Sequence, residues 1–158
     1  MPVSISLSVN GRTFDVEVEP TEMLVNVLRE RLGFVGTNKV CSQGICGACT
    51  VLLDGLATTS CLLLAAQADG CEVTTVEGLE RDGELSVLQE AFLRHGAVQC
   101  GYCTPGFLMT ATALLRNNGD PTRDEIVDGV RGNICRCTGY AKIVDAISSA
   151  AKTLRAAK

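Results

Sequence analysis

The sequence of 158 residues has no tryptophan, a single histidine and only six aromatic residues. A core of this chain must therefore rely on aliphatic side chains, with further support from metal ligation that ties loops together. The sequence also has no run of lysine and arginine, and its formal net charge is -4. This balance gives no electrostatic footprint for nucleic acid or for an anionic membrane, so we expect neither partner.

The N-terminus shows no targeting segment. Residues 1–10 begin an alternating strand pattern at once, without a basic n-region, a twin arginine or a long apolar stretch. We therefore expect a cytoplasmic protein. Because thiols are kept reduced in that compartment, a disulfide scaffold is disfavoured.

What the sequence does contain is nine cysteines, and eight of them form two quartets. The first quartet has four, two and eleven intervening residues and consists of Cys41, Cys46, Cys49 and Cys61. An x4, x2 run followed by a distant fourth cysteine is the spacing of plant-type [2Fe-2S] ferredoxins. Gly44 and Gly47 lie where such a loop must bend and let backbone N–H groups approach the sulfurs. Residues 41–49 are therefore predicted to form a cluster loop.

The second quartet pairs Cys100-x2-Cys103 with Cys135-x-Cys137. Four cysteines in two pairs also suit a tetrahedral zinc site, although the one-residue spacer of the second pair is tighter than a usual zinc loop. The spacing alone favours a second [2Fe-2S] cluster and leaves zinc as the alternative. A Rieske centre is excluded because it needs two histidines, and His95 is the only one.

The ninth cysteine, Cys71, belongs to neither quartet. Free cysteine commonly behaves as a small hydrophobic residue. We expect Cys71 to be buried as an apolar residue without a redox role.

The first part of the chain is patterned for strands. Two stretches of alternating apolar and polar residues flank Asn10-Gly11, which favours a type I′ turn and a β-hairpin with one apolar face. Thr21 is expected to cap a helix that ends near Gly33 and covers that face. The apolar positions of this helix are Leu24, Val27, Leu28 and Leu32.

The cysteine loop leads into further short elements. Residues 50–53 and 56–58 are predicted to form a second hairpin around Asp54-Gly55, a short helix is expected near Ser60, and residues 72–76 are expected to close the sheet. This order predicts a β-grasp, ferredoxin-like domain over residues 1–76. Residues 77–85 are polar and glycine-bearing, which is typical of a linker.

Residues 86–158 change to helical periodicity. Thr104-Pro105 suits an N-cap and first helical position, and Thr122-x-x-Glu125 is a capping box. The apolar stripes comprise Val87, Leu88, Ala91 and Phe92; Phe107, Leu108, Ala111, Leu114 and Leu115; and Tyr140, Ile143, Val144, Ile147 and Leu154. They predict four short helices in a bundle, so the fold class is α+β. Both loops that carry the second quartet then emerge at the same end of the bundle.

Three long motifs resemble a known family. They are Cys-x-x-Gly-x-Cys-Gly-Ala-Cys-Thr-Val at 41–51, Gln-Cys-Gly-Tyr-Cys-Thr-Pro-Gly at 99–106, and Gly-Asn-Ile-Cys-Arg-Cys-Thr-Gly-Tyr at 132–140. Their sequence and intervals are similar to those of the two-[2Fe-2S] subunit of molybdenum hydroxylases, the xanthine oxidase family. The resemblance covers essentially the whole chain, including the order of a ferredoxin-like domain and a four-helix bundle.

The resemblance implies an electron-transfer subunit. In that family a substrate carbon is hydroxylated at a molybdenum-pterin centre, and electrons pass through two [2Fe-2S] clusters to FAD. The length of this chain leaves no room for the other cofactor domains, so a large molybdenum subunit and a medium FAD subunit are expected, commonly in a dimer of heterotrimers. A free-standing two-cluster electron carrier and a zinc-stabilised interaction module are the alternatives.

The resemblance also implies residue roles. The cluster nearer molybdenum would be held by Cys100, Cys103, Cys135 and Cys137, and the cluster nearer flavin by the first quartet. Gln99 and Cys137 match positions that approach the pterin cofactor. No residue of this chain matches a catalytic base, so the substrate site is expected on the molybdenum subunit.

Overall fold

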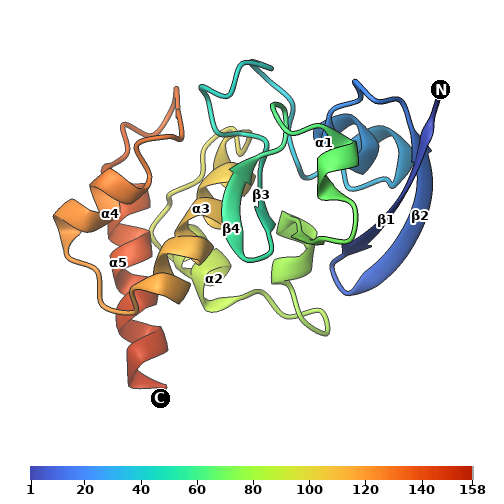
Figure 1. Cartoon of the computed structure of the whole chain (residues 1–158). Helices are drawn as coiled ribbons and strands as arrows, with labels where there is room; N and C mark the ends of the chain where they lie inside the picture. Colours follow the sequence, from blue (N-terminus) through green and yellow to red (C-terminus); the bar gives the residue numbers. More distant parts are fainter. Residues whose placement is uncertain (158) are drawn as a thin grey trace.

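The structure, a computed structural model, describes residues 1–157. The chain has a mixed α+β fold. The two termini lie at opposite ends of the molecule (Figure 1). Strands occur only between residues 3 and 74 of the described chain, whereas helices α2 to α5 follow from residue 87 onward. No helix among residues 1–157 is long and apolar enough to cross a membrane.

A five-stranded sheet forms the first part of the structure, with the order β2-β1-β5-β3-β4. The strands are β1 (Val3–Val9), β2 (Arg12–Val18), β3 (Thr50–Leu53), β4 (Leu56–Thr59) and β5 (Glu72–Thr74). The hairpin of β1 and β2 turns at Asn10 and Gly11, whose φ angles of 51° and 78° meet the needs of the predicted turn. The second predicted hairpin is also confirmed. Strand β5 closes the sheet by pairing parallel to β1 and antiparallel to β3.

The helix predicted after Pro20 is shorter and wider than expected. It consists of α1 (Leu24–Asn26) continued by a π-helical turn over Val27–Arg31. Met23 precedes α1 without a side-chain capping bond, so the prediction that Thr21 caps this helix is wrong. Leu24, Val27 and Leu28 nevertheless pack on the apolar face of the hairpin, as predicted, against Ile5, Leu7, Val9 and Val18.

No helix begins near Ser60, contrary to the prediction. The Ser60 hydroxyl and its backbone N–H both donate to the carbonyl of Cys49, at 2.7 and 3.3 Å. These bonds tie the residue to the cysteine loop and prevent a helical start there. A 3₁₀ helix follows instead at Ala65–Ala68, and another at Val76–Leu79 replaces the expected end of the last strand.

Four helices form the second part of the structure: α2 (Val87–Arg94), α3 (Thr104–Asn117), α4 (Arg123–Gly129) and α5 (Ala141–Ala156). The predicted capping box of α4 is present, with Thr122 and Glu125 bonded reciprocally. Thr104 is not the N-cap of α3: Cys103 takes that position, without a side-chain capping bond. The apolar stripe predicted from Tyr140 to Leu154, along α5, is shorter than expected, because these two end residues remain 38% and 39% exposed.

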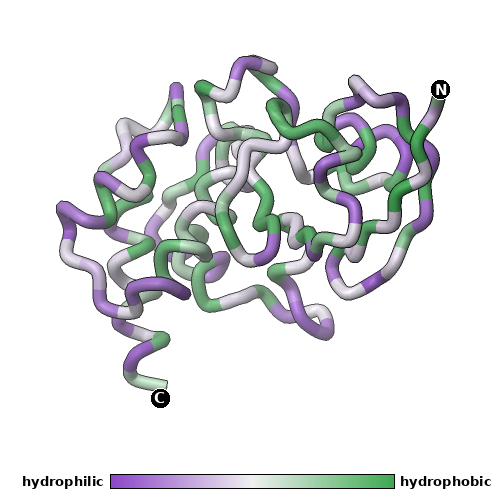
Figure 2. Tube along the Cα trace, viewed as in Figure 1, coloured by the Kyte–Doolittle hydropathy of each residue, from purple (hydrophilic) through white to green (hydrophobic). Residues whose placement is uncertain are grey.

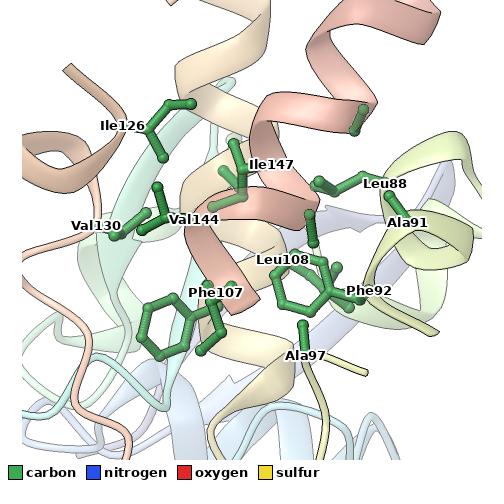
Figure 3. Packing of buried hydrophobic residues seen from close by; sticks show 14 of the residues in the cluster. Leu88, Ala91, Phe92, Ala97, Phe107, Leu108, Ile126, Val130, Val144 and Ile147 are labelled. Atoms are coloured by element: carbon green, nitrogen blue, oxygen red, sulfur yellow. The ribbon is translucent and has the colours of Figure 1, made fainter. Parts of the chain in front are cut away.

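The helical core is aliphatic with two buried phenylalanines, as the composition required. Figure 3 shows Phe92 and Phe107 packed with side chains of all four helices, including Leu88, Ile126 and Ile147. Leu52 of β3 belongs to this core too, because α3 packs against β3. Hydrophilic residues concentrate at peripheral loops, such as that around residues 80–84 (Figure 2). The sheet therefore packs against the helices through β3 and α3.

Candidate metal centres

The first cysteine quartet lies on the loop before β3 and on the turn after β4. Cys49 and Cys61 are buried, at 2% and 4% exposure, while Cys41 and Cys46 are half-buried. The thiols meet in pairs: Cys41 contacts Cys46, and Cys49 contacts Cys61. The first quartet thus has one outer and one inner pair.

The backbone of the cysteine loop is bent into a nest around Cys41. Gly44 and Gly47 have φ angles of +71° and +68°, as the predicted bends require. The backbone N–H of Cys46 and that of Gln43, with smaller contributions from the Cys46 thiol and the Ile45 N–H, lower the pKa of Cys41 to about 6. Cys41 is therefore surrounded by donors that favour a negatively charged sulfur.

The inner pair has a different environment. Burial raises the pKa of Cys49 to about 11, although the backbone N–H of Cys61 acts in the opposite direction. A thiolate at this depth needs a cation to compensate its charge. Iron ligation meets that need, because it holds the sulfur as a thiolate in contact with positive charge.

The second quartet gathers at one end of the helices, as the sequence predicted. Cys100 and Cys103 precede α3, whereas Cys135 and Cys137 lie between α4 and α5. The Sγ atoms of Cys100 and Cys137 are 3.5 Å apart, and both residues are exposed. Cys103 contacts Cys135, which is only 7% exposed. This quartet also consists of an outer and an inner pair.

The two inner thiols of the second quartet differ in their donors. Burial raises the pKa of Cys103 to about 12, and the adjacent Cys135 thiol adds to this effect. Burial acts to raise the pKa of Cys135 as well, but hydrogen bonds from the Thr138 hydroxyl and N–H, the Cys137 N–H and the Cys103 thiol together lower the pKa. Those donors lie 3.0 and 3.3 Å from the sulfur.

Pairs of thiols are the arrangement that a two-iron cluster uses. Four cysteine thiolates would hold one [2Fe-2S] cluster, and two pairs of thiols supply that number. Among residues 1–157, no three His, Cys, Asp or Glu side chains lie close enough to hold one metal ion. The paired thiols and the donor nest around Cys41 fit the cluster chemistry, which would supply one-electron reduction and oxidation.

The two cysteine loops are interlocked. The backbone N–H of Ile134, next to Cys135, donates to the carbonyl of Cys46 at 2.9 Å. The buried side-chain amide of Asn133 donates to the carbonyl of Gly47 at 3.1 Å. One backbone segment therefore joins a ligand candidate of the first quartet to one of the second.

Two further contacts strengthen this junction. Asn38 donates to the carbonyl of Tyr102, between the first two cysteines of the second quartet, at 2.9 Å. At Gly106 of α3, an added Cβ would lie 2.2 Å from the carbonyl oxygen of Gly47. Only glycine permits the backbones to approach so closely at this position. Sequence reasoning missed the roles of these residues, because each acts through a partner far away in the chain.

The remaining predicted residues are placed as follows. Gln99 is exposed beside Cys100, at the same surface as Cys137. Cys71 is half-buried rather than buried: it directly precedes β5, outside the sheet core, and its thiol contacts the carbonyl of Asp69 at 3.9 Å. Burial, with Asp54 nearby, raises the pKa of Cys71, so its thiol stays neutral.

Comparison with known proteins identifies two iron-sulfur regions. Residues 7–79 match the family described as 2Fe-2S iron-sulfur cluster binding domain, and residues 75–148 match the family described as [2Fe-2S] binding domain. The chain is 53% identical over 148 residues to the nicotine 6-hydroxylase small subunit of Paenarthrobacter nicotinovorans, covering 94% of this chain and 89% of that protein. It belongs to the small iron-sulfur subunits of molybdenum hydroxylases.

Other members of the family agree along almost their whole length. The nicotinate dehydrogenase small FeS subunit of Eubacterium barkeri is 49% identical over 145 residues, covering 92% of each chain. In the crystal structure of quinoline 2-oxidoreductase from Pseudomonas putida 86, one chain is 47% identical and superposes with a TM-score of 0.94, with 98% of this chain and 97% of that chain covered. Both matched families bind [2Fe-2S] clusters, which decides against the zinc alternative for the second quartet. As an iron-sulfur subunit of this family, the chain transfers electrons and works with partner catalytic subunits.

Proposed function

We propose that this chain relays electrons from a molybdenum-pterin centre on a large partner subunit to FAD on a medium partner subunit. When bound, each [2Fe-2S] cluster accepts and returns one electron at a time. The observation that carries the proposal is the hydrogen bond from the Ile134 N–H to the Cys46 carbonyl, which connects the two cysteine loops directly. Such a junction suits a fixed route between two redox centres.

The proposed cluster ligands follow the two quartets. Cys41, Cys46, Cys49 and Cys61 would hold the cluster nearer flavin, and Cys100, Cys103, Cys135 and Cys137 would hold the cluster nearer molybdenum. The pairing of the thiols supports these sets, since two pairs serve two irons.

The proposed contact with the pterin involves Gln99 and Cys137. Both lie exposed at the open side of the second quartet, where a partner subunit has access to them. The Gln99 amide offers a donor and an acceptor for a heterocycle, and Cys137 is both a cluster ligand and a surface residue. The chain itself holds the clusters and presents this edge, while substrate chemistry belongs to the large subunit.

We propose further that residues 1–76 form a β-grasp domain and residues 86–158 a four-helix bundle, joined by residues 77–85. The separation of strands and helices along the chain supports this division. The proposed assembly is a dimer of heterotrimers in the cytoplasm. The relatives named as small subunits of larger hydroxylases and dehydrogenases support separate partner chains.

The test is the composition of the native complex purified through this chain. We expect about four irons per chain, since each cluster holds two irons, together with molybdenum, FAD and two larger polypeptides. On addition of substrate, both clusters should become reduced in electron paramagnetic resonance (EPR) spectra. About four irons without molybdenum or partners would favour the free-standing carrier instead, and zinc in place of iron would contradict both.

A further inference from the structure

A closed ring of hydrogen bonds surrounds Cys135, the most buried thiol of the second quartet. The backbone N–H of Cys135 donates to the hydroxyl oxygen of Tyr140 at 3.0 Å. The backbone N–H of Tyr140 donates to Oγ1 of Thr138 at 3.3 Å. The Thr138 hydroxyl then donates to Sγ of Cys135 at 3.0 Å, which completes the ring.

The ring fixes the direction of the Thr138 hydroxyl. A threonine hydroxyl has one proton to donate and two lone pairs that accept. Because the Tyr140 N–H occupies a lone pair of Oγ1, the proton is left free to point at the Cys135 sulfur. The backbone N–H of Thr138 reaches the same sulfur at 3.3 Å, so two donors converge on it.

Tyr140 is held in place from outside the ring. Its φ angle is 70°, a left-handed conformation that is uncommon for a residue other than glycine. The ring of Tyr140 meets that of Phe107 edge to face, with centroids 6.1 Å apart, and Phe107 is fully buried in the helical core. Strained conformations of this kind persist where the surrounding structure imposes them, and they cluster at functional sites. The helical core therefore positions the backbone group that orients Thr138.

In the cluster-loaded protein, the Cys135 sulfur would be a thiolate ligand. Reduction adds one electron to the cluster, and part of that negative charge resides on the ligand sulfurs. A hydroxyl that donates to such a sulfur stabilises the reduced form, and hydrogen bonds to cluster sulfurs are among the factors that set reduction potentials. No protonation change is needed for this effect.

We propose that Thr138 tunes the second cluster: its hydroxyl, oriented by the Tyr140 backbone, raises the reduction potential of the cluster held by Cys135. This inference rests on the proposed function, in which that cluster is the first to accept an electron. Its higher potential would make it a better acceptor from the molybdenum centre. Thr138 is thus a positioning and tuning residue that acts through Cys135, without touching substrate.

The experiment is an EPR-monitored redox titration of the whole purified complex carrying Thr138→Val. At the wild-type midpoint potential, we expect the ratio of reduced to oxidised second cluster to fall about tenfold, which corresponds to ~59 mV for one electron. The first cluster should keep its potential. Thr138→Ser retains the hydroxyl and should restore the wild-type value, whereas a structural role of the methyl group would not be rescued in this way.

Tyr140→Phe provides a matched control. It removes the hydroxyl that accepts the Cys135 N–H but keeps the backbone N–H that orients Thr138. Its second cluster should therefore titrate much closer to wild type than that of Thr138→Val. If valine prevents assembly of the second cluster, the comparison of Thr138→Ala with Thr138→Ser decides instead.

The outcomes separate the two proposals. Equal midpoints in the wild type and in the variants without the hydroxyl, with both clusters present, would overturn the role of Thr138 and leave the relay intact. An equal shift of both clusters would also overturn it, because the ring touches only Cys135. A wild-type complex whose second cluster is not reduced by substrate would contradict the relay itself.

Discussion

The side-chain amide of Asn133 donates a hydrogen bond to the carbonyl of Gly47 across 86 residues of sequence. Both residues are buried; Gly47 lies within the cysteine loop of the first quartet, and Asn133 lies two residues before Cys135 of the second. An added Cβ at Gly47 would lie 2.5 Å from both the Asn133 amide nitrogen and the Gly132 carbonyl oxygen. The two loops consequently pack without space for another atom, and several expectations follow from that closeness.

Gly47→Ala should destabilise the cluster-loaded chain strongly. The positive φ alone disfavours alanine by about 1–2 kcal/mol, and crowding against Asn133 and Gly132 adds about 1–3 kcal/mol. Urea denaturation followed by circular dichroism measures the loss. Gly55→Ala is the matched control, since Gly55 also has a positive φ but has nothing within 4 Å of an added Cβ. Equal losses in the two variants would show that the loops are not tightly packed at Gly47.

Asn133→Ala should lower the free energy of unfolding by about 1–1.5 kcal/mol, because it removes a buried hydrogen bond to the Gly47 carbonyl, which then keeps only its bonds from Thr50. Asn38→Ala removes the other side-chain bond between the loops, but its acceptor is accessible to water. We expect that variant to lose less than about 1 kcal/mol. The same urea experiment distinguishes them. A larger loss for Asn38→Ala would contradict the importance of the buried bond.

Cys103→Ser should abolish the second cluster and leave the first in place. The inner thiol contacts Cys135, and a serine hydroxyl is a poor substitute for thiolate at iron. Iron should fall from about four to about two atoms per chain, and one EPR signal should disappear. Cys71→Ser is the control and should keep both clusters. Loss of either cluster in the control would mean that the ligand sets are wrong.

Removal of the clusters should expose a large difference in thiol reactivity. With its pKa lowered to about 6, Cys41 is a thiolate at neutral pH, whereas Cys49 and Cys103, raised to about 11 and 12, remain protonated. Since the thiolate is the nucleophile, iodoacetamide should label Cys41 first. Its rate should rise through about pH 6 and then level off, while labelling of Cys49 continues to rise above pH 10. Mass spectrometry of peptides measures both rates.

The same labelling applied to the loaded chain provides the reference. Iron ligation should protect Cys41, so its labelling should become slow. Uniform labelling of all cysteines in the cluster-free chain would contradict the donor nest around Cys41.

Local chemistry made much of the fold predictable. Asn10-Gly11 and Asp54-Gly55 determine their turns with neighbouring residues alone, and the capping box of Thr122 and Glu125 lies within four residues. The cysteine quartets were equally visible, because ligand spacing is a property of the chain itself. The first helix differed because its turns widen into π-helical bonding, which periodicity does not reveal.

Long-range contacts explain what the sequence concealed. The helix expected near Ser60 is absent because that hydroxyl bonds back to Cys49. Asn133 stands in a recognisable motif, yet its partner Gly47 is identified only in three dimensions. The hydroxyl of Thr138 likewise gains its direction from a backbone group held by Phe107 of another helix.

The burial of Leu52 within the helical core has a consequence for engineering this chain. A truncated chain that keeps only the first cysteine quartet would end before α2. Leu52 of β3 would then face water, and Gly47 would lose its contacts with Gly106 and Asn133. Such a truncated chain would accordingly need polar substitutions at the positions that become exposed. The strands and the helices of this chain therefore depend on each other's buried contacts, and neither part can be exchanged without replacing those contacts.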